Sequence, residues 1–220
     1  AEEKFRWAVD AAASSALFDR GEQIGGETVE FGATVTTSLS GASIYGSFYR
    51  LLPAGSDQEA FPDEADYSVG VIFEGDAIAA DLSANWLTYP GEDDEASLEL
   101  VGNFDFNAPL APRIIGFYDA DFGDWGLEAL VQPSWESGDW TLYALGRTGF
   151  VEPGDGSAGR SYAGIELGAS RPLSGNIELG AFIRAEAADE DSYASETNKG
   201  VITHARGNGM AIGLSLSVAR

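Results

Sequence analysis

Short segments in which apolar and polar residues alternate recur along the whole chain, each followed by a turn. In the segment 78–86, Ile78, Leu82 and Trp86 share one face, and Asp81 lies on the other. A period of two residues is that of a β-strand with one apolar and one polar side. About twelve such segments, each near ten residues long, have the length of strands that cross a bilayer. The pattern predicts an all-β fold, a closed antiparallel transmembrane β-barrel.

The predicted strands form a single domain, residues 1–220, in which short and long connections alternate. Connections after strands two, four, six, eight and ten are short turns. Those after the odd strands are longer and more polar, except the seventh, around 122–126. This asymmetry is typical of outer-membrane barrels with short periplasmic turns and longer extracellular loops, and an even strand number puts both chain ends in the periplasm. We predict strands at 5–11, 28–38, 42–51, 67–73, 78–89, 96–104, 113–121, 127–135, 140–147, 162–169, 177–186 and 210–218.

Two segments depart from the simple pattern. In 42–51, Ile44 and Phe48 oppose Tyr45 and Tyr49, so the orientation of that strand stays open. In 127–135, Pro133 cannot donate a ladder hydrogen bond and predicts a strand end or a bulge.

Alternation alone also fits a soluble β-sandwich or a lipocalin-like barrel. Two features favour the membrane barrel: the apolar face recurs on nearly every strand, and aromatic residues gather near strand ends, as in an interfacial girdle. The girdle predicted from the sequence consists of Trp7, Trp86, Tyr89, Phe104, Trp125, Trp135 and Trp140.

The opposite, polar face carries many ionisable groups and is predicted to line the barrel lumen. Burying them in a dry core would cost several kcal/mol each unless they were paired, about the penalty of a buried charge. One interpretation is a water-filled, cation-selective pore. The other is a network that only holds the barrel together, with Arg6, Arg147 and Arg184 pairing some of the acids and narrowing the lumen. The predicted lining residues are Arg6, Asp10, Glu30, Asp81, Asn85, Glu99, Asp119, Glu128, Arg147, Glu166, Glu178, Arg184 and Glu186.

The charge balance limits the classes of partner that the chain is expected to bind. The net charge of −24 makes nucleic-acid binding untenable and favours cationic solutes. The chain has no cysteine, so it holds neither a disulfide framework nor a cysteine metal site. Acidic stretches at 57–66, 92–95 and 189–191 are candidates for divalent cations that bridge lipid headgroups, but they lack the spacing of a calcium loop, and solvated loops are the favoured interpretation. We predict no bound metal and no cofactor.

Motifs for catalysis are sparse. The one histidine, His204, lies in a polar segment without a serine motif, and Asp119 with Glu128 could act as acid and base only in the way any lining pair could. The glycine-rich stretch 153–160 lacks the lysine and the strand–helix context of a phosphate loop. We therefore predict that the chain is not an enzyme.

Several short motifs follow one another in the first three quarters of the chain: LTYP at 87–90, EASLE at 95–99, APLAPR at 108–113, FYDAD at 117–121, GLE at 126–128 and, after the first strand, DRG at 19–21. Over about residues 5–174 the chain resembles the TorF-type porins, short proteobacterial outer-membrane barrels of unproven function. The resemblance implies an outer-membrane barrel and a pore. It implies no catalytic signature and no particular substrate.

The sequence thus predicts a monomeric barrel in the outer membrane of a Gram-negative bacterium, in contact with lipid and lipopolysaccharide. Its start, Ala1-Glu2-Glu3-Lys4, reads as a mature end left by signal-peptide removal, and its last residue, Arg220, stands where many such barrels carry Phe or Trp. The predicted function is passive diffusion of small solutes with a preference for cations. The alternatives are a non-conducting barrel whose loops bind lipid, a surface layer or a protein, and a lipid-modifying enzyme.

Overall fold

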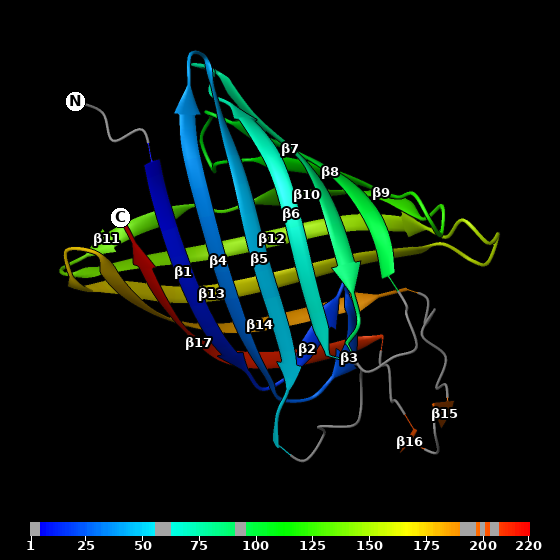
Figure 1. Cartoon of the computed structure of the whole chain (residues 1–220). Coiled ribbons are helices and arrows are strands. Elements are labelled where there is room, and N and C mark those ends of the chain that lie inside the picture. The colour runs from blue at the N-terminus through cyan, green and yellow to red at the C-terminus, as the bar shows by residue number, and fades with distance from the viewer. Residues whose placement is uncertain (1–4, 56–62, 91–95, 190–196, 199–200, 203–206) are drawn as a thin grey trace.

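Twelve antiparallel strands close into a barrel in the part of the chain that the structure describes (Figure 1). The structure is a computed structural model, and it describes residues 5–55, 63–90, 96–189, 197–198, 201–202 and 207–220. The predicted closed barrel is confirmed. Its strands are β1 (Phe5–Ser14), β4 (Thr28–Leu39), β5 (Ala42–Pro53), β6 (Glu64–Phe73), β7 (Ile78–Thr88), β8 (Ala96–Phe106), β9 (Arg113–Asp119), β10 (Trp125–Val131), β12 (Trp140–Glu152), β13 (Arg160–Ser174), β14 (Ile177–Ala188) and β17 (Asn208–Ala219).

The ring closes where the first strand meets the last. Strand β1 pairs with β4 on one side and with β17 on the other. Trp7 and Arg220 exchange both backbone hydrogen bonds at 2.9 Å, so the last residue of the chain still belongs to this seam. The described residues contain no helix long and apolar enough to cross a membrane.

Pro133 divides one predicted strand in two. Strand β10 ends at Val131, and a short strand, β11 (Ser134–Ser137), follows and pairs with the first residues of β12. The Pro133 carbonyl accepts a hydrogen bond from the Ala144 N–H at 3.1 Å, which keeps the chain against β12. The strand end expected at Pro133 is confirmed, and β10 with β11 fills one place in the ring.

The outer surface is apolar around the ring. Strand pairing keeps residues of one face together, and the large side chains of this face are exposed on every wall of the barrel, as lipid-facing residues are. The open orientation of 42–51 is settled, because Ile44 and Phe48 lie on this face and Tyr45 and Tyr49 on the other. Exposed residues of the outer face include Val9, Phe31, Val35, Tyr67, Val69, Leu82, Trp86, Leu100, Ile114, Leu127, Ile165, Leu167, Ile183, Ile212 and Leu214.

On the inner surface, large aromatic rings lie across glycines of the neighbouring strand. Tyr45 is paired with Gly70, and any side chain added at Gly70 would overlap the tyrosine ring. The ring therefore crosses β6, and its hydroxyl donates a hydrogen bond of 3.0 Å to Asp81 of β7. Tyr162 lies over its paired residue Gly149 in the same way. The glycines thus let the tyrosine rings lie across the neighbouring strand.

The connections follow the predicted asymmetry. Tight turns at 40–41, 74–77, 138–139 and 175–176, with the two-proline turn at 107–112, lie at one end of the barrel. The strand ends that the longer connections join, which are Pro53 and Glu64, Thr88 and Ala96, and Ala188 and Asn208, lie at the other, which we call the long-loop end. Within the last of them, the two-residue strands β15 (Thr197–Asn198) and β16 (Val201–Ile202) pair with each other outside the ring (Figure 1).

The connection after β1 differs from the polar loop that the sequence predicts. It forms a small hairpin of β2 (Leu17–Asp19) and β3 (Glu22–Gly25), which packs against β14 and β17. Arg20 and Gly21, with φ of 45° and 90°, make the two-residue turn between the paired residues Asp19 and Glu22. Positive φ at both central residues is the geometry of a type I′ turn. We call residues 17–25 the lumen hairpin, since its contacts, given below, lie on the inner face.

A charge on the outer face should destabilise this barrel far more than the same charge on the inner face. Leu214 lies near the middle of β17 and is 60% exposed on the outer side, and Ser215 beside it faces the lumen. We expect Leu214→Arg to lower the free energy of unfolding by about 2–4 kcal/mol, the cost of an arginine at the bilayer midplane. Ser215→Arg is the matched control with a small expected effect. Urea unfolding in lipid vesicles measures both, and equal losses would contradict the assigned faces.

Candidate functional site

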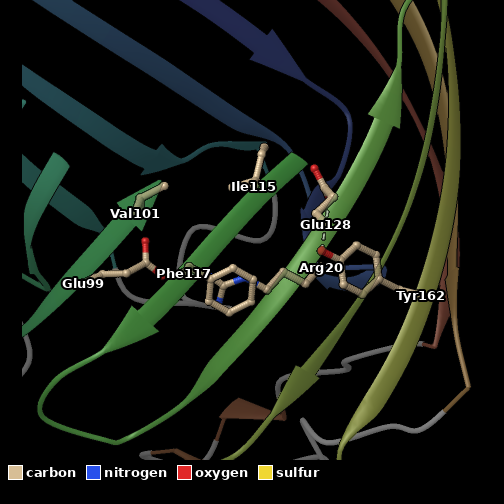
Figure 2. A pocket seen from close by; sticks show the side chains of 7 residues that line it. All are labelled: Arg20, Glu99, Val101, Ile115, Phe117, Glu128 and Tyr162. Carbon is tan, nitrogen blue, oxygen red and sulfur yellow. Dashed lines mark hydrogen bonds and ion pairs between the residues drawn. The ribbon is translucent and has the colours of Figure 1, made fainter. Parts of the chain in front are cut away.

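The tip of the lumen hairpin reaches across to the wall formed by β8 and β9. The Arg20 Nη2 atom lies 2.6 Å from Glu99 Oε2, and the guanidinium carbon lies 3.7 Å from the centre of the Phe117 ring. Figure 2 shows Arg20 extended against the ring, with the Glu99 carboxylate turned toward it. A guanidinium on an aromatic face contributes about 0.5–2 kcal/mol, and the ion pair adds to it. Arg20 therefore fixes the hairpin to the opposite wall.

Two further contacts hold the hairpin from its other side. The Gly21 N–H donates a hydrogen bond of 3.1 Å to Glu186 Oε2 of β14. Arg160, at the start of β13, donates from Nε to the Arg20 carbonyl oxygen at 3.2 Å and pairs with Asp19 at 3.2 Å and with Glu22 at 4.0 Å. The Arg160 and Glu22 side chains are 5% and 0% exposed. Breaking such a buried pair typically costs about 3–5 kcal/mol, so these contacts fix the position of the hairpin.

Arginines and carboxylates alternate on the adjoining wall of β10, β12, β13 and β14, which we call the arginine wall. Arg184 Nε lies 2.6 Å from Glu166 Oε2 and 3.7 Å from Glu186 Oε1. Arg147 Nη1 lies 3.7 Å from Glu186 Oε1 and 3.9 Å from Glu128 Oε2. Tyrosine hydroxyls complete the network, with Tyr143 donating to Glu166 at 2.7 Å and Tyr162 to Glu128 at 3.0 Å. Here each carboxylate is neutralised by a nearby arginine.

The wall of β1 and β4 to β7 has a different composition, and we call it the carboxylate wall. Glu30 accepts a hydrogen bond from Tyr49 at 3.0 Å, and Asp81 accepts one from Tyr45 at 3.0 Å. Asp10 of β1 and Asp66 of β6 lie on the same inner face. Among the described residues, no arginine or lysine nitrogen lies within 4 Å of these four carboxylates. The carboxylates of this wall therefore lack the direct ion pairs of the arginine wall, and the cation nearest to Asp81 is Arg113, which pairs with Asp105.

A pocket of about 130 Å³ lies between the hairpin tip and β8, β9, β10 and β13 (Figure 2). One part of its lining is apolar, and the rest brings two carboxylates and a phenol hydroxyl to the same space. Phe117 packs with Val151 and Tyr162 as a small buried cluster beneath it. The lining residues are Arg20, Glu99, Val101, Ile115, Phe117, Glu128 and Tyr162.

The remaining predicted lining residues lie apart from this centre. Asn85 lies opposite Glu99 on the inner face. Asp119 is buried, and its Oδ1 accepts the N–H groups of the next turn, at 2.9 Å each, so it holds the turn rather than lining an opening. Arg6 and Glu178 are exposed at the end with the tight turns. The predicted pairing holds for Arg147 and Arg184, whereas Arg6 makes no salt bridge within the described residues.

The predicted girdle residues lie on the outer face with one departure. Outward-facing and exposed are Trp86, Phe104, Trp125, Trp135 and Trp140, while Trp7 is half-buried on the same face. Tyr89 follows the end of β7, where strand alternation no longer fixes the side of a residue. It is half-buried at the long-loop end, where burial and the negative charge of Glu64 and Asp66 raise the pKa of its phenol. That surrounding is the mouth of the lumen and not the lipid interface.

Much of the candidate loop chemistry lies outside the described residues. This holds for His204, for residues 57–62 and 92–95, and for 190–191 of the third acidic stretch. At the described margins, Asp63 pairs with Arg50, and Asp189 accepts the Ser161 N–H at 2.6 Å. Among the residues that the structure describes, no group of three or more potential metal ligands comes together.

Sequence reasoning missed the hairpin and its anchors. Arg20 and Arg160 lie in segments assigned to polar loops, and the usual signal of a type I′ turn is Asn-Gly or Asp-Gly rather than Arg-Gly. A usable signal was the pair of short apolar–polar segments on either side of Arg20-Gly21. Alternation places Tyr143 and Tyr162 on the polar face and leaves Tyr45 and Tyr49 open, but none of them was predicted as a lining residue. Their pairing with glycines would have marked them.

The architecture has counterparts among solved structures. No protein-family model matches the chain, and no curated protein matches it in sequence. The NanC porin superposes with a TM-score of 0.58 at 8% identity, over 96% of this chain and 98% of that one. The KdgM porin gives 0.53 at 6% identity over the same shares, and the translocator domain of the autotransporter NalP from Neisseria meningitidis gives 0.53 at 10% identity over 99% and 89%. The fold is that of outer-membrane β-barrels.

Loss of Arg160 should free the hairpin without opening the ring. We expect Arg160→Ala to expose the Arg20–Gly21 peptide bond, because the hairpin loses its contacts at Asp19, Arg20 and Glu22. Trypsin added to folded protein, followed by mass spectrometry of the fragment that begins at Gly21, measures this exposure.

Arg113→Ala is the control for this experiment, because Arg113 pairs with Asp105 on the inner face away from the hairpin. Cleavage after Arg20 should stay at the wild-type level in this variant. Equal protection of the bond in all three proteins would show that Arg160 does not hold the hairpin.

Proposed function

We propose that this protein is a porin of a Gram-negative outer membrane that lets small solutes diffuse through a lumen narrowed by the hairpin, with a preference for cations. The observation that carries the proposal is the separation of charge in the lumen. Among the described residues, the four carboxylates of the carboxylate wall make no direct ion pair, whereas those of the arginine wall are paired with Arg147 and Arg184.

The exposure of charged side chains inside the barrel supports this proposal. Ionised groups buried in a dry interior cost several kcal/mol each, about the penalty expected for unrelieved desolvation. The Arg147 and Arg184 side chains keep 21% and 27% of their surface exposed, and Asp10 is exposed as well. Charged groups that keep this exposure need water inside the barrel to solvate them. A narrow aqueous passage lined by carboxylates then raises the local concentration of cations and lowers that of anions.

The structural similarity to porins supports a pore. It does not indicate the solute, which we infer from the residues that line the lumen. The KdgM porin has also been solved in complex with disordered oligogalacturonate. Carboxylated sugars of that kind are repelled by the carboxylate wall of the present chain. We therefore assign this barrel to cationic or neutral solutes.

Reversal potentials in a KCl gradient test the proposal directly. Refolded protein in a planar bilayer should show steady steps with K⁺ more permeant than Cl⁻. The double variant Glu30→Gln/Asp81→Asn should lose much of that preference, because it neutralises two carboxylates of the carboxylate wall. Asp63→Asn/Glu152→Gln is the matched control, since it removes two carboxylates that lie off the inner face. Equal permeability of K⁺ and Cl⁻ in the unmodified protein would overturn the cation preference.

A second function, a closed scaffold without conductance, is favoured by one observation, the many contacts that fix the hairpin in the lumen. Replacing residues 15–27 by Asn-Gly would join β1 to β4 by a tight turn, because Ser14 and Thr28 are paired. We expect this variant to conduct more than the unmodified protein. A silent unmodified protein with a conducting variant would identify a plugged barrel. Silence in both, with folded protein shown by heat-modifiable gel mobility, would overturn the pore.

A further inference from the structure

The pocket beside the hairpin tip holds the protein's own guanidinium in the place of a ligand. Arg20 stacks on Phe117 and pairs with Glu99, and both partners belong to the barrel wall rather than to the hairpin. We call the Glu99 carboxylate and the Phe117 ring the cation cage. Arg20 and the cage come from different parts of the chain, since 79 residues separate Arg20 from Glu99. The cage is therefore complete without Arg20.

The chemistry of the cage selects a small organic cation. An aromatic face attracts a weakly hydrated, planar cation, and a carboxylate beside it accepts its N–H groups. Val101 and Ile115 line the pocket next to the ring and suit a short apolar stem. Glu128, on the far side of the same pocket, already pairs with Arg147 and accepts a hydrogen bond from Tyr162, so Glu99 is the carboxylate that meets the cation. The pocket of about 130 Å³ leaves space beside Arg20 for several waters or for a small solute.

Other ligand classes fit less well. A hard divalent ion prefers six or more oxygen ligands, and no group of three potential metal ligands gathers among the described residues. An anion would meet Glu99 and Glu128, and the one arginine in the pocket is already paired. An amine or guanidinium finds in the cage the partners that Arg20 uses.

We propose that small guanidinium- or amine-bearing solutes bind in the cation cage by displacing Arg20, and that this displacement loosens the lumen hairpin. The inference deepens the proposed function, because it names the class of solute that the lumen recognises. Binding removes one of the hairpin's anchors and leaves Gly21 on Glu186 and the contacts of Arg160 in place. A solute of this class thus competes with the guanidinium of Arg20, which has the same chemistry and is covalently held by the hairpin.

Competition of this kind has a measurable signature. A ligand can bind only while the competing group has left the cage. Its apparent affinity is therefore the intrinsic affinity multiplied by the fraction of time for which the cage is vacant. If Arg20 occupies the cage nine-tenths of the time, its removal tightens binding about tenfold. Deleting a positive charge from any other place near the site would strengthen cation binding only weakly, through screened electrostatics.

Calorimetric titration of folded, detergent-solubilised protein with methylguanidinium chloride tests the inference without reference to conductance. We expect Arg20→Ala to tighten the dissociation constant about tenfold or more. Adding Glu99→Gln or Phe117→Leu to Arg20→Ala should abolish that gain, because each removes half of the cage. Sodium chloride at the same concentration is the control for ionic strength, and Arg113→Ala is the control for a lumen arginine lost elsewhere.

The outcomes separate this inference from the pore. Unchanged or weaker binding in Arg20→Ala, or equal gains in Arg20→Ala and Arg113→Ala, would overturn the cation cage even if the barrel conducts cations. The expected pattern of affinities in a barrel that does not conduct would support the cage and reject the pore. Gel mobility of folded and heated samples verifies that each variant is folded before it is titrated.

Discussion

A strand in the hydrocarbon of a membrane has no water to satisfy its backbone N–H and C=O groups, so every strand needs two partners. The ring meets this requirement by pairing β1 with β17, down to the exchange between Trp7 and Arg220. Closure then fixes which side chains face out and which face in. The large apolar side chains are thereby collected on the outer face, and most charged groups on the inner face.

Inside the ring, the fold decides where the charged groups lie, and the composition gives only their total. The net charge of −24 says only that acids dominate. The structure separates them into an arginine wall, where carboxylates have cationic partners, and a carboxylate wall, where tyrosine hydroxyls are the hydrogen-bond donors to Glu30 and Asp81. Glycines contribute to this arrangement, because the tyrosine rings lie across them and reach acids on neighbouring or next strands.

Strand number, closure and the outer face could be predicted because a period of two residues survives in the sequence on nearly every strand. The strand end at Pro133 was predictable for the same local reason. The lumen hairpin was not, since an Arg-Gly turn carries no strong signal and its anchors lie far away in sequence. Arg20 reaches Glu99, and Arg160 reaches Asp19, over separations of 79 and 141 residues. Tyr89 was misplaced because alternation ends with the strand.

The sequence separation of the hairpin from its anchors has a consequence for the order of assembly. Residues 17–25 can form their turn as soon as they are made, because the pairs within the hairpin are local. Their docking partners on β8, β13 and β14 come much later in the chain, and loop closure over such lengths is slow. The hairpin can therefore reach its final position only after the strands that hold it have formed. A chain in which β8, β13 and β14 are not yet in place thus has the hairpin turn without the residues that anchor it.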